Sequence, residues 1–254
     1  MPVETTIDGR IASVVINRPE AMNAVSPEVL RELHAALDEV ERSGARACVL
    51  SGAGGRAFSA GADLAEMLEL DAGGARAMLG EGCRLTRRLE QGSFVSIAAI
   101  HGYALGGGME ILLACDLRFA APDAKLGLPE VTVGIFPGWG GIVRLPRQAP
   151  PRLARDMILS GRILSASEAA QAGLVEVADD PVEAANAAAR RLLRAGPEAQ
   201  ALAREVIGET IPLDLDEALA HATEQWLTLV GSEQRVEGHT AFLEKRPPDW
   251  ERFR

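Results

Sequence analysis

A run of three glycines, Gly106 to Gly108, separates two apolar segments of different character. The segment before it, Phe94 to Ile100, is rich in β-branched residues and follows Gly92-Ser93, so it predicts a buried strand. The segment after it, Met109 to Ala114, is apolar and predicts a helix that begins at the glycines. A strand, a glycine turn and a helix in this order are typical of an α/β domain.

Two glutamates near this turn are the strongest indication of chemistry. Glu110 lies inside the apolar helical run, where a lone carboxylate must be paired, protonated or functional because its burial is costly. Glu130 follows Pro129, twenty residues later. Each could instead be an ordinary acid: Glu110 could face solvent or pair with Arg118, and Glu130 could lie on a surface loop.

A second turn of small residues, Ser59 to Asp63, would let a ligand approach main-chain N–H groups closely. Alone it could be merely a tight loop. Together with the exposed N–H groups expected at the start of the helix after Gly106, it favours a two-donor oxyanion hole. The nearby string Gly52 to Ala57 superficially matches a dinucleotide fingerprint, but a further small-residue turn follows where that motif needs a helix.

The remaining pattern predicts the order of the elements. Asp8-Gly9 between two β-rich runs predicts a hairpin, and Ser26-Pro27 to Gly44 bounds a helix with one apolar stripe. Strands are expected at Cys48–Ser51, Leu117–Ala120 and around Leu126, and helices from about Pro150 onward, one of them over Leu215 to Leu229. We divide the chain into a core with the site, residues 1–195, and a helical C-terminal region, residues 196–254.

Composition excludes several classes of function. With 254 residues, 47 % of them hydrophobic, the chain can close a sizeable core. A net charge of −10 argues against nucleic-acid binding. The cysteines Cys48, Cys83 and Cys115 are expected to be reduced core thiols, and neither they nor the four histidines have the spacing of a metal site. With neither a signal peptide nor a membrane span visible, we expect a cytoplasmic protein without a membrane partner.

The sequence resembles the crotonase, or enoyl-CoA hydratase/isomerase, superfamily along essentially its whole length, and its motifs are closest to those of the enoyl-CoA hydratases. The matching stretches are Asn17-Arg18-Pro19, Met22-Asn23-Ala24, Ala57 through Leu64, Ala98 through Asp116, Leu128-Pro129-Glu130, Gly134 through Gly138, and Phe242 through Arg246. So many matches in the same order are highly specific.

The resemblance implies an α/β fold, a spiral of ββα units with a helical C-terminal trimerisation region, in a homotrimer or homohexamer. It implies a lyase of acyl-CoA and fatty acid metabolism that reversibly adds water to 2-enoyl-CoA, giving 3-hydroxyacyl-CoA. Glu110 would be the base and Glu130 the acid, and the N–H groups of Ala62 and Gly107 would form the oxyanion hole. Coenzyme A would be part of the substrate, with neither metal nor redox cofactor.

The substrate contacts that we expect from the same resemblance are Met22, Ala60, Asp63, Leu64, Trp139 and Lys245. Trp139 and Met67 would shape the acyl pocket, although plain packing is an equally good interpretation of Trp139. Two lysines that support the coenzyme's phosphates in some hydratases are replaced by Glu20 and Ala65, so Arg18 or Arg246 would have to compensate.

Two other functions stay open from the sequence. Another crotonase-type lyase or isomerase could use the same site on a specialised acyl-CoA. A CoA-binding assembly protein without catalytic activity is the alternative from a different class, since a fold alone does not fix a function.

Overall fold

The computed structural model describes residues 1–253, and its contacts divide the chain into two compact units, Met1–Ala189 and Arg190–Arg254. The first unit holds two sheets and most of the helices, and the second is helical. The boundary falls inside α8 (Pro181–Leu192). Division of the chain into domains at residues 195 and 196 stays a prediction.

A six-stranded sheet forms the frame of the first unit, in the order β1-β2-β3-β5-β7-β10. β1 and β2 form the hairpin predicted from Asp8-Gly9, with Val3 opposite Ile16, and the strands from β2 onward pair in parallel. Both β3 and β5 are buried along their whole length, as strands at the centre of a parallel sheet are. The strands are β1 (Val3–Asp8), β2 (Ile11–Ile16), β3 (Ala47–Gly52), β5 (Val95–Ile100), β7 (Leu117–Ala120) and β10 (Glu176–Val177).

A smaller sheet brings the two small-residue turns together. Its order is β4-β6-β8-β9, with strands β4 (Ala57–Ser59), β6 (Tyr103–Leu105), β8 (Lys125–Gly127) and β9 (Ile163–Ser165). β4 and β6 are parallel, so the segments that leave their carboxyl ends lie side by side. Those segments are the Ala60-Gly61-Ala62 turn and the Gly106–Gly108 turn.

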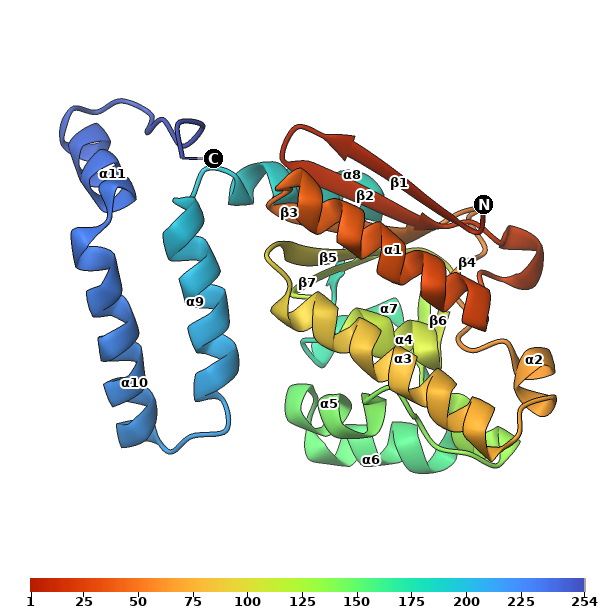
Figure 1. Ribbon diagram of the computed structural model, residues 1–254. Coiled ribbons are helices and arrows are strands. Elements are labelled where there is room, and N and C mark those ends of the chain that lie inside the picture. Colours follow the sequence, from red (N-terminus) through yellow and green to blue (C-terminus); the bar gives the residue numbers. More distant parts are fainter. Residues whose placement is uncertain (254) are drawn as a thin grey trace. The chain divides into compact units, whose positions relative to one another are not determined.

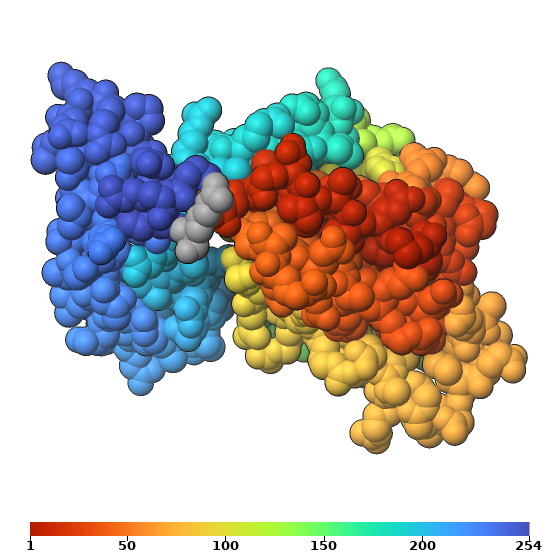
Figure 2. Space-filling view, turned by 45° about the horizontal axis from the view of Figure 1, so that its top comes forward, coloured from red at the N-terminus to blue at the C-terminus, as the bar shows by residue number. Residues whose placement is uncertain are grey.

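Helices α1 (Pro27–Ser43) and α3 (Ala72–Gln91) lie next to each other across one face of the large sheet (Figure 1). In the space-filling view, the red and orange atoms of the hairpin and α1 lie beside the yellow atoms of α3 (Figure 2). α1 begins where predicted, because the Ser26 side chain accepts from the N–H of Val29, and it ends at Gly44 in the left-handed conformation.

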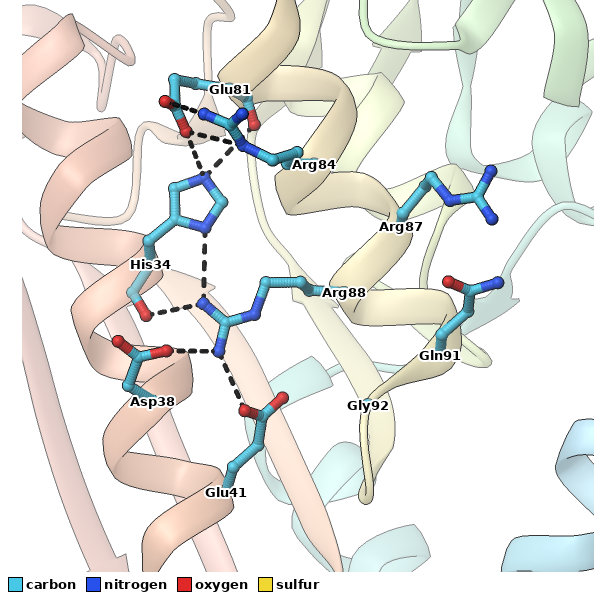
Figure 3. Close-up of a pocket in the computed structure, with 9 residues that line it drawn as sticks. All are labelled: His34, Asp38, Glu41, Glu81, Arg84, Arg87, Arg88, Gln91 and Gly92. Carbon is cyan, nitrogen blue, oxygen red and sulfur yellow. Dashed lines mark hydrogen bonds and ion pairs between the residues drawn. The ribbon is translucent and has the colours of Figure 1, made fainter.

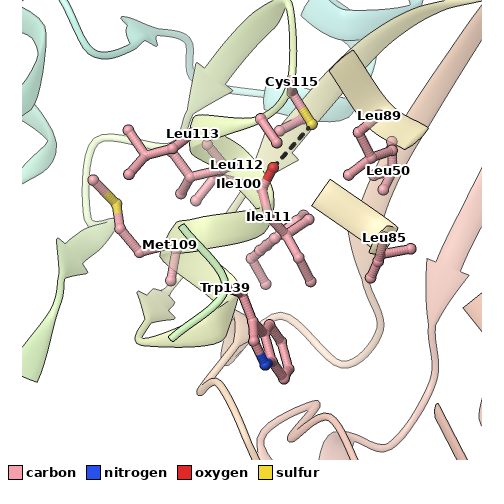
Figure 4. Packing of buried hydrophobic residues seen from close by; sticks show 14 of the residues in the cluster. Leu50, Leu85, Leu89, Ile100, Met109, Ile111, Leu112, Leu113, Cys115 and Trp139 are labelled. Carbon is pink, nitrogen blue, oxygen red and sulfur yellow. Dashed lines mark hydrogen bonds between the residues drawn. The ribbon is translucent and has the colours of Figure 1, made fainter. Parts of the chain in front are cut away.

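The other helices of the first unit are shorter, and of these α4 and α7 pack against the smaller sheet. They are η1 (Pro19–Ala21), α2 (Leu64–Leu68), α4 (Gly107–Leu113), η2 (Pro129–Val133), α5 (Gly141–Gln148), α6 (Pro151–Ser160) and α7 (Ala166–Gln171). Every residue of α4 is buried, and its side chains meet Leu85 and Leu89 of α3 in the core (Figure 4). α4 is therefore fixed on all sides.

The second unit consists of α9 (Pro197–Thr210), α10 (Leu215–Thr228), η3 (Leu229–Gly231) and α11 (Glu233–Leu243). α9 packs against α10, and Glu237 on α11 accepts two bonds from Arg246, at 2.7 and 3.1 Å. The predicted apolar side of α10 stays on the surface of the single chain, since Leu215, Leu219 and Trp226 are more than half exposed.

Several expectations need correction. The region after Pro150 is not purely helical, because it contributes the short strands β9 and β10 to the two sheets. Cys48 and Cys115 are buried, whereas Cys83 is exposed on α3 and is not a core thiol. The expectation for the string Gly52 to Ala57 is confirmed, since it starts no helix and joins β3 to β4. Within residues 1–253, no helix is both long and apolar enough to cross a bilayer.

Candidate active site

The glycine turn and the Ala60–Ala62 turn touch. A Cβ atom built on Gly61, whose φ is +94°, would lie 2.7 Å from the carbonyl oxygen of Leu105 and 2.9 Å from the nitrogen of Gly107. Only glycine permits both the backbone angle and this approach. Within the described residues, no hydrogen bond to another protein group uses the N–H of Ala62 or Gly107. Both amides are therefore available to a ligand oxygen.

Asn23 fixes the segment Ala53 to Ser59, which leads into the Ala60–Ala62 turn, a role that the sequence did not reveal. Its buried side-chain amide donates to the carbonyl oxygens of Ala57 (2.7 Å) and Ala53 (3.0 Å). The Asn23 carbonyl accepts from the hydroxyl of Ser59 at 2.8 Å. Met22 and Asn23 both have positive φ, at +55° and +56°, which is uncommon for residues other than glycine. The strained backbone places the Met22 carbonyl as acceptor for the N–H of Ala60, at 2.9 Å.

Glu110 lies on α4 and is 2 % exposed. Its Oε1 accepts two backbone hydrogen bonds, from the N–H groups of Trp139 and Gly141, both at 2.7 Å. Burial raises the pKa of this carboxyl above its usual range, and the two backbone bonds and the charge of Arg144 oppose that rise. Pairing with Arg118 is excluded, because that guanidinium donates to main-chain carbonyls instead.

Glu130 lies on η2, and both of its carboxylate oxygens are buried without a hydrogen-bond partner among the described residues. A Cβ on Gly106 would be 3.5 Å from its Oε1, which places the carboxylate against the glycine turn. Burial raises the pKa of Glu130 to about 7; the nearby N–H of its own backbone opposes the rise, and the negative charge of Glu110 adds to it. Glu130 is therefore not an ordinary surface acid.

The structure thus brings two glutamates and two glycine turns to one place. One carboxylate is fixed by amides, and the other has a pKa near neutrality and no hydrogen-bond partner in the described part of the chain. Buried, unpartnered acids of this kind are frequent at functional sites. Such a pair can move protons at a ligand whose oxygen is held by the free amides.

The other residues expected at the site occupy different environments. Asp63 precedes α2 and pairs with Arg18 at 3.3 Å, and Leu64, the first residue of α2, is 48 % exposed. Trp139 is 3 % exposed. Lys245 follows α11 in the second unit, with φ +56°.

Both arginines that were expected to compensate for the missing lysines already have partners. Arg18 donates to the carbonyl oxygen of Ala24 and pairs with Asp63, and Arg246 is bound to Glu237 and Glu244.

A separate hollow of about 710 Å³ lies between α1 and α3 and has a charged lining (Figure 3). There Arg88 bridges Asp38 (2.7 Å) and Glu41 (3.0 Å), and His34 lies 3.2 Å from Glu81. These ion pairs join the two helices. The hollow contains none of the residues expected at the site.

The chain is similar to known hydratases over nearly its full length. The sequence profile described as enoyl-CoA hydratase/isomerase matches residues 6–253. A short-chain-enoyl-CoA hydratase of Clostridium acetobutylicum is 38 % identical, covering 94 % of this chain and 93 % of that protein. A crotonyl-CoA hydratase of Syntrophomonas wolfei is 37 % identical, covering 93 % of each.

Solved structures agree with this similarity. A crystal structure of an enoyl-CoA hydratase from Bacillus anthracis has a TM-score of 0.94 to this chain, with 36 % identity, and the match covers 98 % of this chain and 99 % of that one. The predicted crotonase-like α/β fold is thereby confirmed. The chain belongs to the enoyl-CoA hydratase/isomerase family.

Proposed function

We propose that the protein is an enoyl-CoA hydratase, which reversibly adds water to a 2-enoyl-CoA thioester and yields the 3-hydroxyacyl-CoA. The observation that carries this proposal is the pair of buried carboxylates beside the two glycine turns. Glu110 is held by two amides, and Glu130 has no hydrogen-bond partner among residues 1–253. The named relatives include hydratases of short-chain and crotonyl thioesters, which supports the same reaction here.

We infer one role for each group. Glu110, as carboxylate, takes a proton from water while the water oxygen forms a bond to C3. The C2–C3 double bond opens toward C2, and negative charge moves onto the thioester oxygen, where the N–H groups of Ala62 and Gly107 stabilise it. One donor of this kind typically lowers the activation barrier by roughly 3 kcal/mol. Glu130, as carboxylic acid, then gives its proton to C2.

The pKa of Glu130 suits this role. A value of about 7 keeps a substantial protonated fraction near neutral pH, where an ordinary glutamate would be ionised. The two carboxyls influence each other, so they titrate as a pair. Dehydration is the same path reversed, with Glu130 as base and Glu110 as acid.

The substrate contacts belong to this proposal. Ala60 belongs to the turn that supplies one oxyanion donor, and Met22, Asp63 and Leu64 lie next to that turn, which supports a role for these residues beside the thioester. Met67 and Trp139 as walls of the acyl pocket, and Lys245 as a contact of the coenzyme, follow from the family resemblance. No metal or redox cofactor is needed for these steps.

The assembly that we propose is a homotrimer or homohexamer. Its support is the exposed apolar surface of the second unit, where large side chains of α9, α10 and α11 face outward: Ile207, Ile211, Leu215, Leu219, Trp226, Phe242 and Leu243. Monomers rarely leave so much apolar surface uncovered. The cytoplasmic location stays a prediction.

The test is turnover of crotonyl-CoA. We expect the conjugated enoyl absorbance to disappear with formation of 3-hydroxybutyryl-CoA, and we expect Glu110→Gln and Glu130→Gln to abolish it while retaining the fold. A double-bond shift without water uptake would support an isomerase instead. Tight binding of the thioester without any turnover would support the non-catalytic alternative.

A further inference from the structure

The roles of the two glutamates and the two oxyanion turns do not explain why Trp139 is buried. The indole is 3 % exposed and lies in the core beside Ile111 of α4 and Leu85 of α3 (Figure 4). A ring this large in a glycine-rich loop, Pro137 to Gly141, must have space made for it elsewhere.

Two glycines make that space, one on each side of the indole. A Cβ on Gly82 of α3 would overlap the pyrrole side of the ring, at Nε1, Cδ1 and Cε2. A Cβ on Gly107 would lie 2.7 Å from Cε3 and 3.0 Å from Cη2, and closer still to Cζ3. The benzene side of the indole therefore rests directly on the residue whose N–H is one of the two oxyanion donors.

The peptide group of Trp139 reaches the other half of the site. Its N–H donates to Oε1 of Glu110 at 2.7 Å. Its carbonyl oxygen accepts from the Thr86 hydroxyl at 3.0 Å and from Nη1 of Arg144 at 2.9 Å. Arg144 is itself fixed by two bonds to Glu90 of α3, at 2.6 and 2.7 Å.

We propose that Trp139 is a positioning residue that sets both halves of the site: its ring fixes Gly107, and its peptide group, held by Thr86 and Arg144, fixes Glu110. This inference rests on the proposed hydration. A displacement of a catalytic group by about 1 Å can cost roughly a hundredfold in rate, so small changes at Trp139 should be visible in catalysis.

The ring and the peptide group can be tested separately. Trp139→Phe keeps the peptide group and a ring near Gly82 but removes the atoms that rest on Gly107. Arg144→Met keeps the indole but removes a donor to the Trp139 carbonyl and a positive charge near Glu110. Each variant should therefore affect one half of the site and spare the other.

For the ring, the readout is binding of two thioesters. Acetoacetyl-CoA can bind as its enolate, which needs the oxyanion donors and absorbs in the near ultraviolet, whereas butyryl-CoA remains a neutral thioester. We expect Trp139→Phe to weaken enolate binding about tenfold and butyryl-CoA binding less than about twofold, with kcat falling and KM unchanged. Phe94→Leu, a contraction of another buried aromatic side chain, is the control and should leave the ratio of the two affinities unchanged.

For the peptide group, the readout is the acidic limb of the pH profile of kcat/KM, where Glu110 gains its proton. The charged groups facing Glu110 are Glu130 from η2 and Arg144 from α5, with Glu90 of α3 beyond Arg144. Loss of Arg144 leaves Glu110 easier to protonate. We expect Arg144→Met to raise the midpoint of this limb by about half a pH unit or more, which lowers kcat/KM about threefold at pH values below the midpoint.

Two matched variants serve as controls for the pH profile of Arg144→Met. Glu90→Gln removes the partner of Arg144 but not the guanidinium, so it should not move the limb upward. Arg144→Lys restores the charge and should return the limb most of the way, even if Arg144→Met proves unstable. Equal weakening of both thioesters by Trp139→Phe, or no weakening, would overturn the role of the ring. A limb that Arg144→Met leaves in place would overturn the role of the Arg144 charge. Thr86→Val removes the other donor to the Trp139 carbonyl without a change of charge, and a kcat that it leaves unchanged would overturn the role of the peptide group.

Failure of the proposed function would look different. If the wild-type protein does not hydrate crotonyl-CoA, the hydratase assignment fails. The ratio of enolate to thioester affinity in Trp139→Phe would still decide whether the ring supports Gly107.

Discussion

Replacing Glu130 by glutamine should make the protein more stable at alkaline pH while removing its activity. The carboxylate oxygens of Glu130 are buried and have no hydrogen-bond partner within residues 1–253. Ionising such a group inside the protein is unfavourable, whereas a neutral amide of the same shape avoids that cost. Glu130 therefore lowers the stability of the folded protein at alkaline pH, although the reaction requires this residue.

The size of the effect follows from the pKa. The pKa of Glu130 is raised from 4.5 to about 7 in the folded protein. Because the folded state holds its proton more tightly than the unfolded chain, stability falls as pH rises from about 4.5 and the full cost is present above about 7. A shift of this size corresponds to roughly 3 kcal/mol, and allowance for the partly exposed side chain reduces it to about 2 kcal/mol.

Urea unfolding at pH 5 and pH 8.5 measures this difference directly. We expect Glu130→Gln to raise the free energy of unfolding by about 2 kcal/mol at pH 8.5 and to change it little at pH 5, where Glu130 is protonated in the folded protein. Glu39→Gln, on the exposed face of α1, removes the same charge and should be neutral at both pH values. An equal effect of Glu130→Gln at the two pH values, or destabilisation at pH 8.5, would refute this reasoning.

Three further predictions concern the same site. The value of kcat/KM for hydration should fall as pH rises through about 7, because Glu130 then loses the proton that it delivers; a flat profile from pH 6 to 9 would exclude that role. Gly61→Ala should abolish activity and lower the melting temperature, whereas Gly134→Ala, with a similar positive φ but open space around it, should cost only about 1 kcal/mol. Asn23→Ala should destabilise the protein by about 2 to 3 kcal/mol, measured by urea unfolding, because the carbonyl oxygens of Ala53 and Ala57 lose their donor; a change below about 0.5 kcal/mol would contradict this.

Local signals in the sequence were sufficient for much of the fold. Asp8-Gly9 located the hairpin, Ser26-Pro27 and Gly44 bounded α1, and the triple glycine marked the start of α4. In each case one or two residues specify a backbone conformation regardless of the rest of the chain.

Features that depend on distant contacts were not visible in this way. α3 carries Gly73, Gly74, Gly80 and Gly82, which weaken any helical pattern, and only the indole of Trp139 explains why Gly82 must lack a side chain. β9 and β10 have three and two residues, which is too few to show a periodicity in the sequence. They form because they pair with neighbouring strands. Arg144 reaches Glu90 across 54 positions.

The two glutamates were identified from the sequence, but the difference between their hydrogen-bond environments was not. Glu110 lies two residues after Gly108, and Glu130 directly follows Pro129. Nothing nearby in the sequence indicates that Glu110 accepts two amides while Glu130 accepts no bond from another side chain within residues 1–253. That asymmetry arises from the loop Pro137 to Gly141, which folds back over α4. It separates the proposed base from the proposed acid.

The most direct test of the central claim is the fate of isotopes from the solvent. When crotonyl-CoA is turned over in water labelled with ¹⁸O and deuterium, two carboxyls acting on one water molecule place ¹⁸O in the hydroxyl at C3 and one deuteron at C2. We expect this product from the wild-type protein and none from Glu110→Gln or Glu130→Gln. Deuterium at C4 without ¹⁸O uptake, or label incorporated equally well by either variant, would contradict the account.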